Sequence, residues 1–168
     1  GKSVDTSMGF TPLDGIIMGT RSGSVDPSAV EFVQNKLGFT PAQMSDYLNK
    51  KSGFLGLSGQ FSDNRDITSA AQQGDKRSQL VTDMLTYEIK KYIGSYTAAM
   101  NGLDVVIFTG GIGENAPEVR KGVCENMEYL GIKLDSSVND GLKGKLTKIS
   151  APDSKVEVWV IPTNEELL

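Results

Sequence analysis

The longest stretch of helical periodicity lies in the middle of the chain and begins near Asp75. Apolar and aromatic side chains recur there at three- and four-residue steps: Leu80, Met84, Leu85, Ile89, Tyr92, Ile93, Tyr96 and Met100. Such spacing places these side chains on one face of a helix, and Gly102 is of the residue type that commonly ends one. The pattern predicts a long amphipathic helix whose apolar stripe faces either a core or an interface.

Two shorter helices are predicted upstream, and each has proline at its first helical position. Asp26 is placed to cap the first, which we expect to cover residues 27–36 and to end at the glycine that follows. Thr40 and Gln43 have the spacing of a capping box for the second, which we expect to cover residues 41–50. Both predictions rest on local signals alone.

The last third of the chain carries the patterns of strands. Residues 104–109 form a continuous apolar run between turns, which is typical of a strand buried on both faces of a parallel sheet. Residues 146–149 and 156–161 are predicted as further strands. The order strand, helix, strand, strand, helix indicates an α/β layer fold. We interpret the helix-rich segment 27–102 as an insertion into one partial domain that covers residues 1–168.

Glycines separate several of these elements. The glycine-containing stretches 9–24 and 53–66 are predicted as loops, and residues 110–114 as a turn. Asn115 and Glu118 then have the spacing of a capping box for a helix. The buried stripe expected on that helix is Val119, Val123, Met127 and Leu130.

Composition narrows the classes of function. Apolar residues make up 38% of the chain and charged residues 23%, which is typical of a folded globular protein. The net charge is −4 with no basic run, which argues against a nucleic-acid partner. No apolar run is long enough to cross a membrane. The single cysteine, Cys124, fits a core position in a reducing cytoplasm, where we expect the protein. The chain has no histidine, so a histidine base or metal ligand within it is excluded.

The glycine-rich segment after the apolar run is the first candidate site. Glycines between a strand and a helix let the main chain approach a bound nucleotide or anion closely. A tight turn that only needs positive φ explains them equally. Gly111, Gly113 and Ala116 also match a dinucleotide fingerprint, with Asp135 about 20 residues further as the ribose-binding acid.

Three other polar segments are candidates. Arg21 lies in a loop rich in glycine and serine, where its planar guanidinium can bind a phosphoryl group, or it is an ordinary surface arginine. Residues 62–66 can bind a base or ribose, or form Asx turns. Glu165 and Glu166 can complement a helix dipole, or one of them can hold Mg²⁺.

Residues 163–166 have the spacing of a capping box, and the chain ends two residues later. Because isolated helices that short do not hold, we expect the chain to be a piece of a longer polypeptide, truncated at both ends.

Four segments, in order and with matching gaps, resemble the acetate kinase family nearly residue for residue. They are Val-Asp-Thr-Ser-Met-Gly-Phe-Thr-Pro-Leu-Asp-Gly (4–15), Met-Gly-Thr-Arg-Ser-Gly-Ser-Val-Asp-Pro (18–27), Asp-Val-Val-Ile-Phe-Thr-Gly-Gly-Ile-Gly-Glu-Asn (104–115) and Ile-Pro-Thr-Asn-Glu-Glu-Leu (161–167). The resemblance covers essentially the whole chain. It implies the α/β, ribonuclease H-like fold shared by acetate and sugar kinases, actin and heat-shock chaperones, with this chain as most of the second, nucleotide-binding lobe.

The resemblance also implies a role for each matching residue. Arg21 resembles the arginine that stabilises the transition state, and Glu165 the acid associated with Mg²⁺. The residues that resemble the family's nucleotide contacts are Asp63, Asn64, Arg65, Gly111, Ile112, Gly113, Glu114 and Asn115. The family's other catalytic groups lie on a lobe that this chain does not contain.

The function that the resemblance implies is reversible phosphoryl transfer between ATP and acetate, giving acetyl phosphate and ADP, in a homodimer that uses Mg²⁺. We expect this chain alone to be inactive. Three alternatives stay open from the sequence: a propionate kinase, a non-catalytic nucleotide-binding module, and an NAD-dependent oxidoreductase based on the dinucleotide fingerprint.

Overall fold

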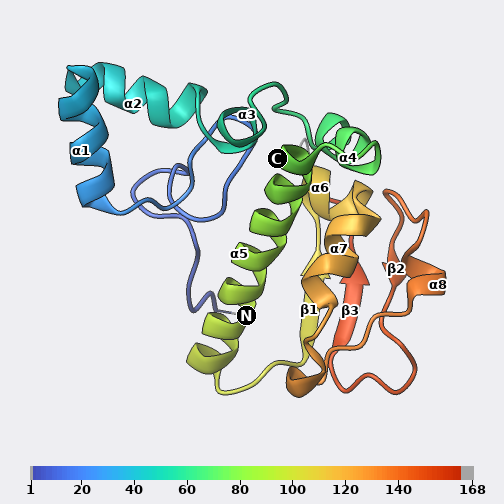
Figure 1. Cartoon of the computed structure of the whole chain (residues 1–168). Coiled ribbons are helices and arrows are strands. Elements are labelled where there is room, and N and C mark those ends of the chain that lie inside the picture. Colours follow the sequence, from blue (N-terminus) through green and yellow to red (C-terminus); the bar gives the residue numbers. More distant parts are fainter. Residues whose placement is uncertain (1, 164–168) are drawn as a thin grey trace. The chain divides into compact units, whose positions relative to one another are not determined.

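The protein was studied as a computed structural model, which describes residues 2–163 (Figure 1). By its internal contacts the chain divides into two compact units, residues 1–88 and 89–168. The boundary between them falls inside α5 (Lys76–Met100).

The first unit contains helices and loops, with no strand among its described residues. Its helices are α1 (Pro27–Leu37), α2 (Pro41–Lys50), α3 (Gly53–Ser58), α4 (Asn64–Gln72) and the first half of α5. The two capped helices agree with prediction. The Asp26 side chain accepts a hydrogen bond from Ser28 N, and Thr40 and Gln43 form the complete capping box. Residues 9–24 contain turns and bends only, as expected of a loop.

The prediction of a loop over residues 53–66 is wrong, since α3 and the start of α4 lie there. No side chain caps α3. Its first free N–H groups instead donate to carbonyl groups of a distant loop, those of Met18 and Gly19. Because that partner lies more than 30 positions away, no local pattern indicates the helix. The start of α4 does have a local signal, the Asp63 cap, but the sequence pattern there was interpreted as a base or ribose contact or as Asx turns, and not as a helix start.

The long helix α5 is present, but its buried side differs from the predicted stripe. Ser78, Val81 and Leu85 are buried, whereas Leu80 is 49% and Met100 is 48% exposed. A serine can be buried on this side of α5 because the Ser78 hydroxyl and N–H both donate to the Asp75 carboxylate, which satisfies the buried polar groups. Among the described residues, no helix, α5 included, combines the length and apolar character that crossing a membrane requires.

The second unit is built on a small sheet. Its elements after α5 are β1 (Val105–Phe108), α6 (Gly110–Asn115), α7 (Pro117–Cys124), the 3₁₀ helix η1 (Glu128–Leu130), α8 (Ser136–Asn139), β2 (Thr147–Lys148) and β3 (Glu157–Val160). The strand order is β1-β3-β2, with β1 parallel and β2 antiparallel to β3. All three strands and the parallel pairing agree with the sequence patterns.

One expectation about this sheet is wrong. Val106 and Phe108 of β1 are buried, but Val105 is 40% and Ile107 is 52% exposed. In the part of the chain that the structure describes, only one face of β1 is covered. An apolar run does not by itself distinguish one covered face from two.

The core of this unit gathers side chains from the sheet and from α7. The buried apolar residues include Val119, Val123, Met127, Ile132, Ile149, Val158 and Val160. Three of the four residues of the predicted stripe are thus buried, and Leu130 is half-buried. The prediction that one helix carries all four is wrong, because α7 ends at Cys124 and Leu130 lies in η1. Cys124 is also buried, and burial raises the pKa of its thiol to about 12. It is therefore a core residue, as predicted, and an inert one.

Candidate functional site

The main chain of Arg21 is held in place, while its side chain is exposed. Met18 N donates to Arg21 O at 3.1 Å, which closes a turn. The next N–H, that of Ser22, donates to Leu48 O in α2 at 2.9 Å. Within residues 2–163 the guanidinium contacts Met18 alone, from Nη1 to Sδ at 3.8 Å. The loop therefore has a defined path and presents a cation at its surface.

The same loop is bonded to the N-terminus of α3. Ser52 N donates to Thr20 O at 3.0 Å, Phe54 N to Met18 O at 2.9 Å and Leu55 N to Gly19 O at 2.9 Å. These are the groups that a capping side chain would otherwise satisfy. The carbonyl groups of the loop thus take the place of a side-chain cap for α3.

A close approach of main chains brings this loop to the second candidate segment. A Cβ added to Gly19 would lie 2.5 Å from Ser62 O. Since real Cβ atoms do not come that close to a carbonyl oxygen, only glycine fits there. The structure thereby places the Arg21 loop next to the Asp63–Arg65 segment, two candidates that are separate in the sequence.

Asp63 has two structural tasks. Its carboxylate caps α4 by accepting from Arg65 N at 2.8 Å. It also forms a two-point ion pair with the Arg65 guanidinium, with Nε–Oδ1 at 3.0 Å and Nη2–Oδ2 at 2.7 Å. The hydrogen bonds from Arg65 lower the Asp63 carboxyl pKa to about 2. The pair orients the exposed Arg65 side chain, and the Asn64 amide donates to the Thr68 hydroxyl at 3.5 Å.

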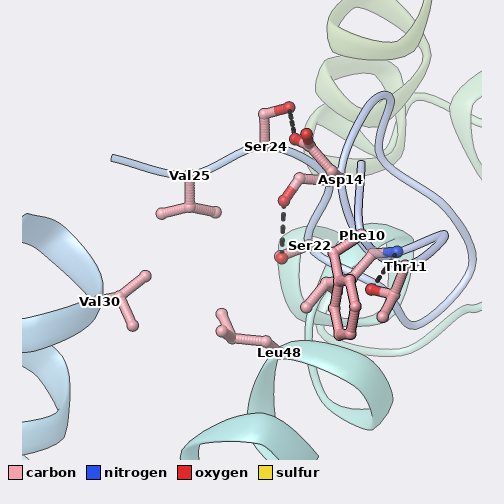
Figure 2. A pocket seen from close by; sticks show the side chains of 10 residues that line it. Phe10, Thr11, Asp14, Ser22, Ser24, Val25, Val30 and Leu48 are labelled. Atoms are coloured by element: carbon pink, nitrogen blue, oxygen red, sulfur yellow. Dashed lines mark hydrogen bonds between the residues drawn. The ribbon is translucent and has the colours of Figure 1, made fainter. Parts of the chain in front are cut away.

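A pocket of about 230 Å³ adjoins the residues that follow Arg21 (Figure 2). Its lining is mostly apolar and includes Phe10, Leu13, Val25, Val30 and Leu48. The last two reach into it from α1 and α2, and Ser24 donates to the Asp14 carboxylate at its edge. Ser22 and Gly23 also line the pocket, so the Arg21 loop forms part of its wall.

The glycine segment of the second unit is helical, which corrects the predicted turn over residues 110–114. Gly110 has φ of +71°, which reverses the chain after β1, and α6 starts at once. The predicted Asn115–Glu118 capping box is also wrong. Asn115 belongs to α6, where its Nδ2 donates to Gly111 O at 2.9 Å, and Pro117 opens α7 with no side-chain cap.

Glu114 joins the carboxyl ends of two neighbouring strands. Its Oε1 accepts from Gly110 N at 2.9 Å, just after β1. The same oxygen accepts from Thr163 N at 2.9 Å and Thr163 Oγ1 at 3.1 Å, just after β3. These bonds, foremost that from Thr163 N, lower the pKa of the Glu114 carboxyl.

Arg120 is a structural residue that sequence reasoning missed. Arg120 is fully buried. Its guanidinium donates to two carbonyl groups of α6, Gly113 O at 2.9 Å and Glu114 O at 3.0 Å. It also donates to Leu142 O, beyond α8, at 2.8 Å. Its Nε also donates to the side chain of buried Asn139 at 2.8 Å. The one available signal was an arginine inside an apolar stripe, between Val119 and Val123.

The geometry around Asp135 argues against the dinucleotide interpretation. The Asp135 carboxylate caps α8 by accepting from Ser137 N and Ser137 Oγ, which also lower its pKa. In addition, β1 pairs with β3 alone among the described strands, so it is not the central strand that a dinucleotide fold places before its glycines.

The predicted metal acid, Glu165, lies outside the described residues. Within residues 2–163 the structure has no group of three or more His, Cys, Asp or Glu side chains that could hold a metal ion. The described candidates fall into two sets: Arg21 and Asp63–Arg65 in residues 1–88, and Gly111–Asn115 in residues 89–168.

Comparison with known proteins gives a consistent result. All of residues 1–168 match the acetokinase family. An acetate kinase of Carboxydothermus hydrogenoformans is 56% identical over 168 residues, which are 100% of this chain and 42% of that relative. The chain thus spans less than half the length of the curated relatives that it matches.

Solved structures agree with the sequence comparison. Porphyromonas gingivalis acetate kinase superposes with a TM-score of 0.93 and 51% identity, over 95% of this chain and 40% of the other. A propionate kinase from Francisella tularensis gives a TM-score of 0.90 and 41% identity, over 99% of this chain and 42% of the other. The fold is therefore that of the acetate and propionate kinases, as the resemblance implied.

Proposed function

The chain belongs to the acetokinase family, and we propose that it supplies the nucleotide-binding part of an acetate kinase. The reaction is reversible phosphoryl transfer between ATP and acetate, giving acetyl phosphate and ADP. The observation that carries the proposal is the Arg21 loop, a rigidly bonded main chain that presents an exposed guanidinium. The 56% sequence identity to a curated acetate kinase over the whole chain supports the choice of reaction.

Arg21 is proposed to stabilise the transition state. In phosphoryl transfer the negative charge lies on the oxygens of the transferring group, and the protein contributes position and positive charge rather than covalent chemistry. A guanidinium offers fixed charge and a planar fork of donors for those oxygens. Because its main chain is already held, little ordering remains to be done when the substrate binds.

Two segments, one in each compact unit, are proposed as nucleotide contacts. The proposed contacts in the second unit lie in the short helix α6, where Gly111 leaves open space for a close ligand: Gly111, Ile112, Gly113, Glu114 and Asn115. Asp63 orients Arg65, and Asn64 stands between them at the start of α4. Glu114 is already committed to Gly110 and Thr163, so its side chain shapes the segment, and we assign direct contact to the main chain around it.

Mg²⁺ is proposed as the metal, with Glu165 as its associated acid. A bound Mg²⁺ offsets the charge of a polyphosphate. Residues 2–163 contain no metal-binding cluster, so no step of the mechanism is derived through the ion. A cytoplasmic homodimer is part of the same proposal, and sedimentation at several concentrations tests the assembly.

Propionate is the second candidate substrate. The likeness to the Francisella tularensis propionate kinase favours it, although at lower identity than the acetate kinases. Measuring kcat/KM for acetate and for propionate in the same enzyme preparation distinguishes the two substrates. One methylene in an apolar pocket changes the binding free energy by about 1–3 kcal/mol.

The proposal is tested in a chimera. These 168 residues replace the matching segment of the Carboxydothermus hydrogenoformans relative, and hydroxamate trapping measures acetyl phosphate. We expect an active enzyme, and we expect Arg21→Ala to lower kcat by roughly a thousandfold with a much smaller effect on KM. A folded chimera without activity, or an Arg21→Ala variant with unchanged kcat, would contradict the proposal.

A further inference from the structure

We propose that Gly53 is a positioning residue for Arg21: its missing side chain lets the N-terminus of α3 act as the template on which the arginine loop is shaped. The inference rests on the proposed function, since it assigns to Gly53 an effect on the step that Arg21 serves. The two residues are 32 positions apart in the sequence, and no motif links them.

The contact itself leaves no room for a side chain. A Cβ on Gly53 would lie 2.0 Å from Met18 O, 2.5 Å from Arg21 O and 3.0 Å from Arg21 N. All three obstacles are main-chain atoms, which cannot rotate away as the end of a side chain does. Gly53 also has φ of +60°, which side chains rarely adopt. Any larger residue therefore displaces the Arg21 main chain or the start of α3.

The contact acts on the arginine because the rest of the template surrounds it. The N–H groups of Ser52, Phe54 and Leu55 flank Gly53 and donate to the carbonyl groups of residues 18–20. The Thr20 hydroxyl adds a further bond, to Asn49 O at 2.8 Å. Since the exposed Arg21 guanidinium contacts only the Met18 sulfur among the described residues, its position depends on that of its main chain.

Gly38 provides a matched control. It has a similar positive φ, +65° against +60° for Gly53, at the C-terminus of α1. An added Cβ there meets nothing within 4 Å. Gly38→Ala therefore also places a side chain at a positive φ, but without the collision with the Arg21 loop.

The experiment measures kcat and the KM for ATP and for acetate in four variants of the chimera: Gly53→Ala, Gly38→Ala, Arg21→Ala and the double variant Arg21→Ala/Gly53→Ala. We expect Gly53→Ala to lower kcat by about tenfold to a hundredfold, as a displaced catalytic group does, and Gly38→Ala to change it less than about twofold. In the Arg21→Ala background, we expect Gly53→Ala to have little further effect on kcat, because the group it positions is gone.

Two outcomes would overturn the inference. One is a folded Gly53→Ala variant with wild-type kcat. The other is a Gly53→Ala effect that stays undiminished in the Arg21→Ala background, which indicates a general structural role. If Gly53→Ala does not fold, Thr20→Val replaces it: this variant removes the bond to Asn49 O at nearly constant volume. It must then lower kcat severalfold, and only when Arg21 is present.

A readout without catalysis separates this inference from the proposed function. In the 168-residue chain, hydrogen exchange at Ser22 N–H reports the bond to Leu48 O that holds the loop. We expect Gly53→Ala to speed this exchange and Gly38→Ala to leave it unchanged. Unchanged exchange in Gly53→Ala overturns the inference, whereas an inactive wild-type chimera with the expected exchange pattern overturns only the function.

Discussion

Arg120 shows how a single buried charge can organise a segment through hydrogen bonds to main-chain carbonyl groups. The side chain is fully buried, and its guanidinium donates to carbonyl oxygens and to the side chain of Asn139. Burial lowers the pKa of the guanidinium, yet an arginine stays protonated in a protein. The charge is therefore satisfied by oriented dipoles, which fix the C-terminal end of α6 against the α8 region.

Removing the charge of Arg120 should destabilise the folded protein. Arg120→Met keeps most of the volume but leaves several buried carbonyl groups and the Asn139 amide without a donor. We expect the free energy of unfolding to fall by roughly 3 kcal/mol. Urea unfolding followed by circular dichroism measures it. Lys121→Met, an exposed neighbour on α7, is the control, and a loss for Arg120→Met no greater than for that control would contradict the expectation.

Glu114 should make stability depend on pH. Its hydrogen bonds hold the carboxyl pKa in the folded state below the ordinary glutamate value of 4.5. A group of this kind contributes stability that is present above pH 4.5 and is lost as the pH falls through the lower, folded-state pKa. The stability difference between wild type and Glu114→Gln should therefore narrow as the pH is lowered below 4.5.

Urea midpoints measured from neutral pH down to about pH 3 test this dependence, over the range in which carboxylates titrate. Glu125→Gln, an exposed glutamate at the end of α7, makes the same change of charge away from the strand ends. A wild-type to Glu114→Gln difference that stays constant with pH would contradict the expectation.

At the scale of elements, the helices that carry their own caps were predictable. The α2 capping box is complete in the structure: Gln43 N donates to Thr40 Oγ1 at 3.3 Å, and Thr40 N to Gln43 Oε1 at 2.8 Å. By contrast, α3 and α6 lack a side-chain cap, and both were predicted as loop or turn. In α3 the first N–H groups donate to Met18 O and Gly19 O, far away in the sequence, so no local pattern indicates the helix. In α6 the Gly110 N–H donates to the Glu114 side chain of the same helix, an arrangement that the capping patterns do not include.

The Thr40 cap should contribute measurably to stability. Thr40→Ala removes the acceptor for Gln43 N, and we expect a loss of about 1 kcal/mol. Ser45→Ala, at an exposed position inside α2, is the control and should change stability by no more than about 0.5 kcal/mol. Equal losses from the two variants in urea unfolding would mean that the capping box contributes little.

At the scale of the whole molecule, the candidates divide between two compact units whose boundary falls inside α5. The chain spans 42% of the Carboxydothermus hydrogenoformans relative. We therefore expect the 168 residues alone to form no acetyl phosphate from ATP and acetate above a heat-killed control. Hydroxamate trapping checks this, and acetyl phosphate formed by the chain alone would refute it.

Nucleotide binding by the chain alone is a separate question. Calorimetric titration with ATP and Mg²⁺ addresses it, with Arg65→Met as the comparison variant. Binding without turnover would fit a chain that acts as a nucleotide-binding module by itself. Turnover in the chimera with no binding to the isolated chain would place part of the nucleotide site on the rest of the enzyme.

The sequence by itself determined those features whose physical cause lies within a few residues or in a long ordered pattern. These are the caps of α1 and α2, the strands, the core position of Cys124, and the family resemblance of four motifs. The tertiary structure alone decided which distant groups meet. Gly53 touches Arg21, Glu114 joins the ends of β1 and β3, and Arg120 bonds α6 to the segment after α8. Main-chain carbonyl and N–H groups make most of these contacts, and every residue type carries them, so their partners leave little trace in the sequence.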